Sequence, residues 1–154
     1  MKKESILIVN SFNSKEHKGG AEIISEILCN QIKKENEKVY FLTTTIKKNQ
    51  TIDFLNKKKF INIIFYPWFP GPYKKSNSKI YKIVWHFCQI LSPFPAIQLL
   101  GLILRIKPRV TIVSNIYGLS LPLLILIKII SKKTFLWIHD FNWICIYSST
   151  FNFV

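Results

Sequence analysis

Residues 5–32 constrain the fold more than any other stretch, because they predict a strand, a glycine turn and a helix in immediate succession. Residues 6–9 form a short apolar run without polar interruption, which is typical of a parallel strand covered on both faces. A polar loop and a diglycine pair follow, and apolar side chains then recur at helical spacing on one predicted face: Ile24, Ile27, Leu28 and Ile32. This is half of a βαβ unit, and ligands of open α/β sheets bind outside the carboxyl end of such a strand.

Strands and helices also alternate along the rest of the chain. The pattern predicts strands at residues 39–42, 60–66, 110–113 and 134–138, and helices at residues 80–91, 94–106 and 119–130. The lysine-rich segment 46–59 is weakly patterned and is expected to be a surface helix or loop. This alternation predicts an α/β fold with a Rossmann-like parallel sheet and helices on both faces, and residues 1–154 are long enough for one such domain.

The diglycine pair, Gly19 and Gly20, has a chemical use as well as a structural one. Glycine lets the backbone approach an anion closely, and the amino end of the following helix adds a partial positive charge. The pair matches neither the dinucleotide fingerprint nor a P-loop, so a simple tight turn is the competing interpretation. Glu22, in the first helical turn, is expected to complement the helix dipole.

Polar residues follow three of the predicted strands, and parallel strands bring their carboxyl ends to one edge of a sheet. We therefore expect a crevice shared by Asn10, Asn115, His139 and Asp140. A histidine there can donate a hydrogen bond to a sugar hydroxyl or a phosphate, or transfer a proton near neutral pH. The competing interpretation is that the His-Asp pair only ends a strand and caps a helix.

The formal net charge of +14 is compatible with nucleic acid, an anionic membrane or a phosphorylated substrate as partner. Nearly all of the positive charge is lysine, the only arginines being Arg105 and Arg109, and no nucleic-acid-binding motif is present. We therefore expect no nucleic-acid partner. Attraction to acidic lipid or to a phosphorylated substrate stays open.

The three cysteines, Cys29, Cys88 and Cys145, are an odd number at wide spacing, which favours reduced thiols over a disulfide framework. His17 and His86 have no partners at metal-ligand spacing, so we expect no metal site. The apolar run near the amino terminus is too short for a secretion signal.

Residues 110–130 admit a second interpretation, because this largely apolar stretch is about the length that spans a bilayer. Asn115, Pro122 and Lys128 interrupt it, and buried strands with their covering helices also read as continuous apolar sequence. We expect a strand, a turn and a helix here, with a transmembrane segment as the alternative.

Five segments together resemble the N-terminal domain of family 4 glycosyltransferases: Ile-Leu-Ile-Val-Asn at 6–10, Gly-Gly-Ala-Glu at 19–22, Lys-Pro-Arg-Val-Thr-Ile-Val-Ser-Asn at 107–115, Tyr-Gly-Leu-Ser at 117–120 and Ile-His-Asp-Phe-Asn-Trp-Ile-Cys at 138–145. These retaining enzymes have the GT-B fold, in which two Rossmann-like domains face each other across a cleft. The resemblance covers nearly the whole chain, and it rests on the order and spacing of the five segments. The resemblance therefore implies an incomplete GT-B N-terminal domain.

The resemblance implies transfer of a sugar from a nucleotide diphosphate sugar to a glycan or lipid-linked acceptor, with no cofactor and no obligatory metal. The glycine turn then lies against the donor diphosphate, and His139 lies near the donor sugar. The candidate catalytic residues are His139 and Asp140, and the candidate substrate-binding residues are Gly19, Gly20, Glu22, Asn115 and Tyr117.

Members of this family are well over twice as long, and their C-terminal domain supplies most contacts to the nucleotide. We therefore expect a truncated gene product or one half of a split enzyme of polysaccharide biosynthesis, without the donor domain and inactive alone. We expect it in the cytoplasm, and its basic, aromatic surface suits peripheral attachment to the inner membrane face. The alternatives are a non-catalytic partner or binding subunit with the same fold, and a small membrane protein.

Overall fold

The chain folds around a six-stranded sheet in the computed structural model, which describes residues 5–12, 19–34, 38–45, 53–57, 60–65, 79–116 and 119–137. For residues 53–57, 60, 79, 81, 82, 85, 86 and 89 it describes the backbone alone. Across the sheet the strands lie in the order β3 (Asp53–Lys57), β4 (Phe60–Phe65), β2 (Lys38–Thr44), β1 (Ser5–Phe12), β5 (Val110–Val113) and β6 (Lys133–Leu136).

The first strand in the sequence is the centre of this sheet. β1 pairs in parallel with β2 on one side and with β5 on the other, and β4 and β6 extend the parallel pairing outward. Leu7, Ile8 and Val9 are completely or almost completely buried, as expected of a strand covered on both faces.

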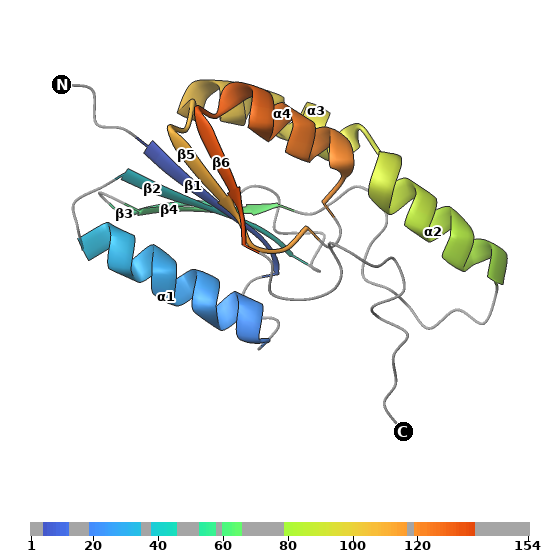
Figure 1. Cartoon of the computed structure of the whole chain (residues 1–154), viewed down its shortest axis with the longest axis horizontal. Helices are drawn as coiled ribbons and strands as arrows, with labels where there is room; N and C mark the ends of the chain where they lie inside the picture. The colour runs from blue at the N-terminus through green and yellow to red at the C-terminus, as the bar shows by residue number, and fades with distance from the viewer. Residues whose placement is uncertain are drawn as a thin grey trace.

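Helices cover both faces of the sheet (Figure 1). α1 (Gly20–Lys34) lies on one face, and α3 (Phe94–Ile106) and α4 (Leu121–Ile130) lie on the other. Right-handed crossovers account for this, because strands added on opposite sides of β1 place their connecting helices on opposite faces. The predicted α/β fold, a Rossmann-like parallel sheet with helices on both faces, is confirmed.

Two apolar cores result, one on each face. The larger core packs the sheet against α3 and α4 and contains Leu42, Leu99, Ile103, Leu123 and Ile127, all of them nearly inaccessible to solvent. The smaller core packs α1 on the sheet through four buried side chains: Ile8, Cys29, Val39 and Phe41. Most of the apolar area that stabilises the domain is therefore on the α3 and α4 side.

The segment expected to be a surface helix or loop at residues 46–59 contains a strand instead. β3 runs antiparallel to β4, with Asp53 opposite Ile64 and Lys57 opposite Phe60. Backbone hydrogen bonds to β4 stabilise this short strand. Such bonds do not depend on side-chain type, so a lysine-rich sequence gives no pattern from which the strand could be predicted. The described sheet thus carries one antiparallel edge strand on an otherwise parallel sheet.

The predicted apolar face of α1 is rotated relative to the face that packs on the sheet. The buried residues of this helix are Glu22, Ser25 and Cys29, whereas Ile27 is 51% exposed. Leu28 and Ile32 contact the smaller core only partly. The prediction for Leu28 and Ile32 is therefore partly correct, and that for Ile24 and Ile27 is wrong.

Residues 110–130 do not form one continuous helix. They contain β5, a connection and the ten-residue helix α4. Within the described ranges, no helix is both long enough and apolar enough to cross a bilayer.

Candidate functional site

The glycine pair forms the amino end of α1. The N–H of Ile23 donates to the carbonyl of Gly19 at 3.2 Å, so Gly19 occupies the capping position and Gly20 begins the helix. The N–H groups of Gly20 and Ala21 precede this first helical hydrogen bond. A side chain added at Gly20 would meet no described heavy atom within 4 Å, so packing does not require glycine there.

Two side-chain hydrogen bonds join α1 and the carboxyl ends of β1 and β5. The hydroxyl of Ser25, in the second turn of α1, donates to the Ser114 hydroxyl at 2.9 Å. The hydroxyl of Ser11, near the end of β1, donates to Oδ1 of Asn115 at 3.2 Å. Segments about 100 residues apart in the sequence thus meet at one polar edge of the sheet, as expected for parallel strands.

The end of β1 is irregular, and a second set of polar groups is buried there. The β1–β2 register shifts between Val9 and Phe12, and Asn10 Nδ2 donates to the carbonyl of Phe12 at 3.0 Å. The Thr44 hydroxyl, at the end of β2, donates to the carbonyl of Ser11. Asn10 Oδ1 is buried without a hydrogen-bond partner in the described structure, which leaves an acceptor at this edge.

Glu22 modifies the electrostatics of this edge. It lies in the first turn of α1 and is only 4% exposed. A carboxylate in the first turn offsets part of the positive helix dipole, as the sequence predicts. Binding of an anion here would therefore depend on direct hydrogen bonds from the backbone N–H groups more than on the dipole.

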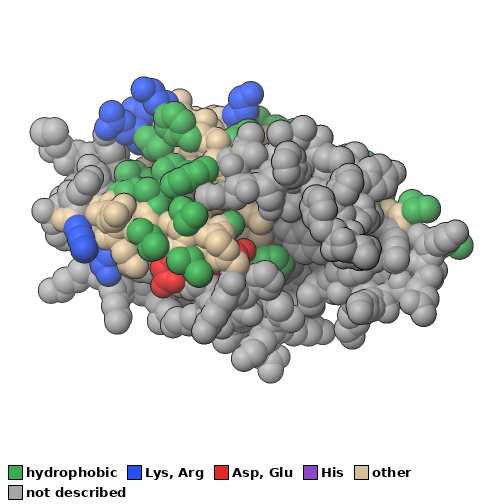
Figure 2. Space-filling view, turned by 60° about the horizontal axis from the view of Figure 1, so that its bottom comes forward, with side chains coloured by type: hydrophobic (Ala, Val, Ile, Leu, Met, Phe, Trp, Pro, Cys, Tyr) green, Lys and Arg blue, Asp and Glu red, His purple; other side chains and the backbone are tan. Residues whose placement is uncertain are grey.

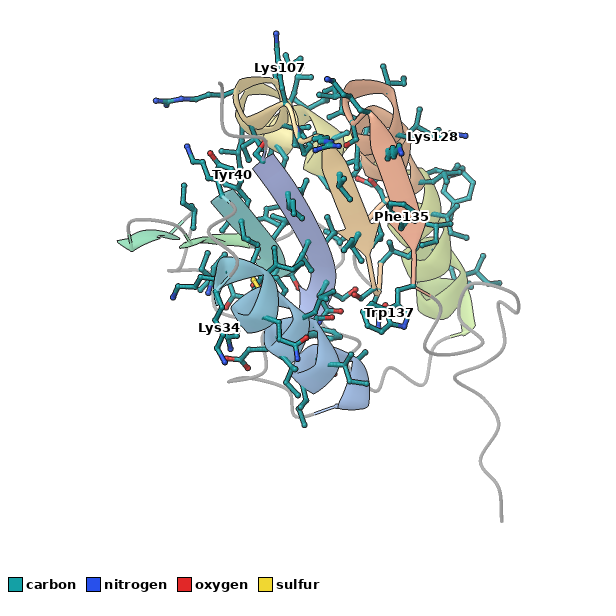
Figure 3. The ribbon with its side chains drawn as sticks, turned by 60° about the vertical axis from the view of Figure 1, so that its left-hand side comes forward. Lys34, Tyr40, Lys107, Lys128, Phe135 and Trp137 are labelled. Carbon is teal, nitrogen blue, oxygen red and sulfur yellow. The ribbon has the colours of Figure 1, made fainter. Side chains whose placement is uncertain are left out.

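The structure brings four of the seven predicted site residues to this edge: Gly19, Gly20, Glu22 and Asn115. Tyr117, His139 and Asp140 lie outside the described residues. Trp137 is described, and its N–H donates to the carbonyl of Val113 at 2.8 Å, which continues the β5–β6 ladder. Figure 3 shows Trp137 at the carboxyl end of β6. The last described residue of the chain, Trp137, therefore lies at the polar edge.

Sequence reasoning did not single out Ser11, Ser25 or Ser114. Ser11 lies near the end of β1, and Ser114 directly follows β5. These positions at strand ends could have identified both serines as candidates for the polar edge. Ser25 gave no signal, because a serine inside a predicted helix usually faces solvent.

Apolar side chains also collect on the face that carries α1 (Figure 2). Ile23, Ile24 and Ile27 of α1 are exposed, as are Phe135 of β6 and Trp137 directly after it. Phe135 pairs with Ile112, which pairs with Ile8 beneath α1, so Phe135 points to the same side of the sheet as the helix.

Other chemistry has little support in the described ranges. No group of three His, Cys, Asp or Glu side chains there could hold a metal ion. Cys29 and Cys88 are free thiols, and burial, against an opposing effect of the Lys33 charge, raises the pKa of Cys29 from 9.0 to about 12. Cys29 is therefore a protonated core residue and no nucleophile.

Compared with known proteins, the sequence matches no protein-family model and no curated protein. The polar edge of the sheet is therefore the main basis on which a function can be proposed.

Proposed function

We propose that this chain is the acceptor-side half of a retaining glycosyltransferase that uses a nucleotide diphosphate sugar. One observation carries the proposal: the Ser25–Ser114 and Ser11–Asn115 hydrogen bonds join the amino end of α1 to the ends of β1 and β5. Ligands of open α/β sheets bind at such an edge. The five segments that resemble family 4 glycosyltransferases support the same function.

In this proposal the N–H groups of Gly20 and Ala21 bind the donor diphosphate. The space beside Gly20 supports this role, because no described atom fills it. Asn115 binds a sugar hydroxyl. His139 and Asp140, two and three residues after Trp137, lie near the donor sugar and the acceptor hydroxyl.

A second domain, in the same polypeptide or in a partner chain, supplies the remaining contacts to the nucleotide. The chain alone therefore binds a donor weakly and does not transfer sugar. No metal ion or cofactor is needed in this proposal. The complete enzyme acts at the inner membrane face on a glycan or lipid-linked acceptor.

The test is titration of isotope-labelled protein with UDP and with UDP-glucose, followed by NMR. We expect shift changes at residues 19–25 and 114–116. Gly20→Val should weaken binding about tenfold by blocking the approach of the diphosphate. Gly101→Val is the matched control, because a side chain at Gly101 in α3 also meets no described atom within 4 Å.

Equal binding by the Gly20→Val and Gly101→Val variants would contradict the role of the glycine turn. Shift changes confined to other parts of the chain would contradict the site itself. GDP and ADP serve as further probes, because the base is recognised by the second domain in this proposal and should matter little here.

The second candidate function is a non-catalytic partner subunit. It is favoured by β6, whose Phe135 and Leu136 point to opposite faces of the sheet and are each more than half exposed. An edge strand with apolar side chains exposed on both faces is typical of a protein-protein contact. Co-expression with the product of an adjacent reading frame, followed by size-exclusion chromatography, tests this candidate: a stable complex without sugar transfer would favour it.

A further inference from the structure

α2 (Lys79–Leu91) turns its apolar face to solvent. Ile83 is 68% exposed and Phe87 is 63% exposed. The other large exposed side chains of this helix follow the same helical spacing: Ile80, Val84, Ile90 and Leu91. In a globular protein such a stripe normally packs on the core, so the apolar face of α2 lacks its usual contact in the described structure.

The position of α2 explains why this stripe is exposed. In Figure 1, α2 continues the layer of α3 and α4 beyond the sheet. The outer sides of α3 and α4 are apolar as well, with exposed side chains at Ile97, Leu100, Leu104, Ile125 and Ile129. We call these residues and the stripe on α2 the outer apolar surface. Contiguous exposed apolar side chains on three helices are typical of an interaction surface.

The charge distribution indicates which partner this surface fits. All of the acidic residues lie outside residues 54–139, so α2, α3 and α4 contain lysine and arginine but no carboxylate. Arg105, Lys107 and Lys128 are exposed at the ends of α3 and α4. Figure 3 shows Lys107 and Lys128 projecting outward. A surface that is both apolar and basic complements anionic lipid.

We propose that the outer apolar surface docks this chain on an anionic lipid bilayer. The stripe on α2 enters the boundary between headgroups and acyl chains, and the basic residues contact lipid phosphates. A second copy of the chain is a poorer partner, because it would bring two basic surfaces without carboxylates against each other.

This inference identifies the surface behind the membrane attachment included in the proposed function, but its test is independent of sugar transfer. Vesicle binding is measured without donor or acceptor. It can fail while nucleotide binding at the polar edge succeeds, and the reverse also holds.

The experiment is flotation of the full chain with vesicles of phosphatidylcholine alone, or with about 30% phosphatidylglycerol. We expect binding to the anionic vesicles that weakens as salt is raised. The double variant Ile83→Gln with Phe87→Gln should bind about tenfold less, because glutamine keeps the helix propensity and removes the apolar contact.

The matched control is Ile23→Gln with Ile27→Gln, which replaces two exposed apolar residues by glutamine at the same spacing on α1, on the opposite face of the sheet. It should bind vesicles like the unmodified chain, and circular dichroism should show equal helix content in all three proteins. Equal loss in both double variants would overturn the assignment to α2. Equal binding to neutral and anionic vesicles would overturn the role of charge.

A third outcome would replace the bilayer with a second copy. If light scattering shows a dimer that the α2 variant dissociates, and vesicles of either composition fail to bind, the outer apolar surface is a dimer interface and the proposal is wrong.

Discussion

The hydroxyl oxygens of Ser25 and Ser114 lie 2.9 Å apart in a buried contact between α1 and the end of β5, although 89 residues separate them in the sequence. This hydrogen bond holds the amino-terminal part of α1 against the sheet edge. It also explains the rotation of the helix, because a short polar side chain rather than an isoleucine must face the sheet at this turn.

Ser25→Ala should destabilise the protein by about 1–2 kcal/mol, because it removes a hydrogen-bond partner from the buried Ser114 hydroxyl. The double variant Ser25→Ala with Ser114→Ala should cost less than the sum of the two single changes. Urea unfolding of the four proteins gives the coupling energy. Strict additivity would show that the hydrogen bond does not contribute to stability.

Two isoleucines of α4 provide a test of the larger core. Ile127 is fully buried, whereas Ile129 is 76% exposed. Ile127→Ala should reduce the free energy of unfolding by about 2–5 kcal/mol, because it removes apolar contacts and leaves a cavity. Ile129→Ala should change it by less than about 0.5 kcal/mol. Chemical denaturation measures both free energies of unfolding. If the two variants lose similar amounts, α4 packs on the sheet in another orientation.

Lys107, which ends α3, adopts a left-handed conformation with φ of 43°, and its N–H donates to the carbonyl of Ile103 at 2.9 Å. Glycine adopts this conformation without steric cost, so Lys107→Gly should stabilise the protein by about 0.5–1 kcal/mol. Lys132→Gly is the control, because Lys132 has no positive φ and glycine there should be destabilising. Thermal unfolding of both variants measures the change in stability, and we expect a higher melting temperature for Lys107→Gly and a lower one for Lys132→Gly.

The raised pKa of Cys29 predicts a dependence of stability on pH. Burial favours the neutral thiol, so the folded chain keeps this proton at pH values where the unfolded chain releases it. The resulting stability is fully present below pH 9.0 and is lost as the pH rises toward about 12.

Unfolding experiments across this range should show a shallower decline for Cys29→Ala than for the unmodified chain, after correction for the other groups that titrate there. Cys29 should also resist alkylation in the native protein at neutral pH. Rapid alkylation of Cys29 without unfolding would show that the thiol is accessible.

Much of the fold could be predicted from the sequence. The apolar run in β1 and the bounds of α3 and β5 agree with the structure, because fully buried strands and proline-bounded helices leave strong patterns. β3 could not be predicted, since its pairing with β4 depends on the partner strand and the two residues between them are lysines without a turn signal.

The candidate site was predictable in outline only. Parallel topology places Gly20 and Asn115 at one edge of the sheet, and the sequence alone indicates this. The hydrogen bonds of Ser11 and Ser25 depend on the rotation of α1 and on the register shift at the end of β1, which no local pattern encodes. His139 and Asp140 remain predictions.

The central position of β1 has a consequence for how the chain is made. β1 emerges from the ribosome first, but its neighbour β5 follows roughly a hundred residues later, about 5–20 s at ordinary rates of translation. During that interval one side of β1, with its apolar run at residues 6–9, has no partner. The nascent chain is therefore expected to need shielding by a chaperone until residue 113 has left the exit tunnel.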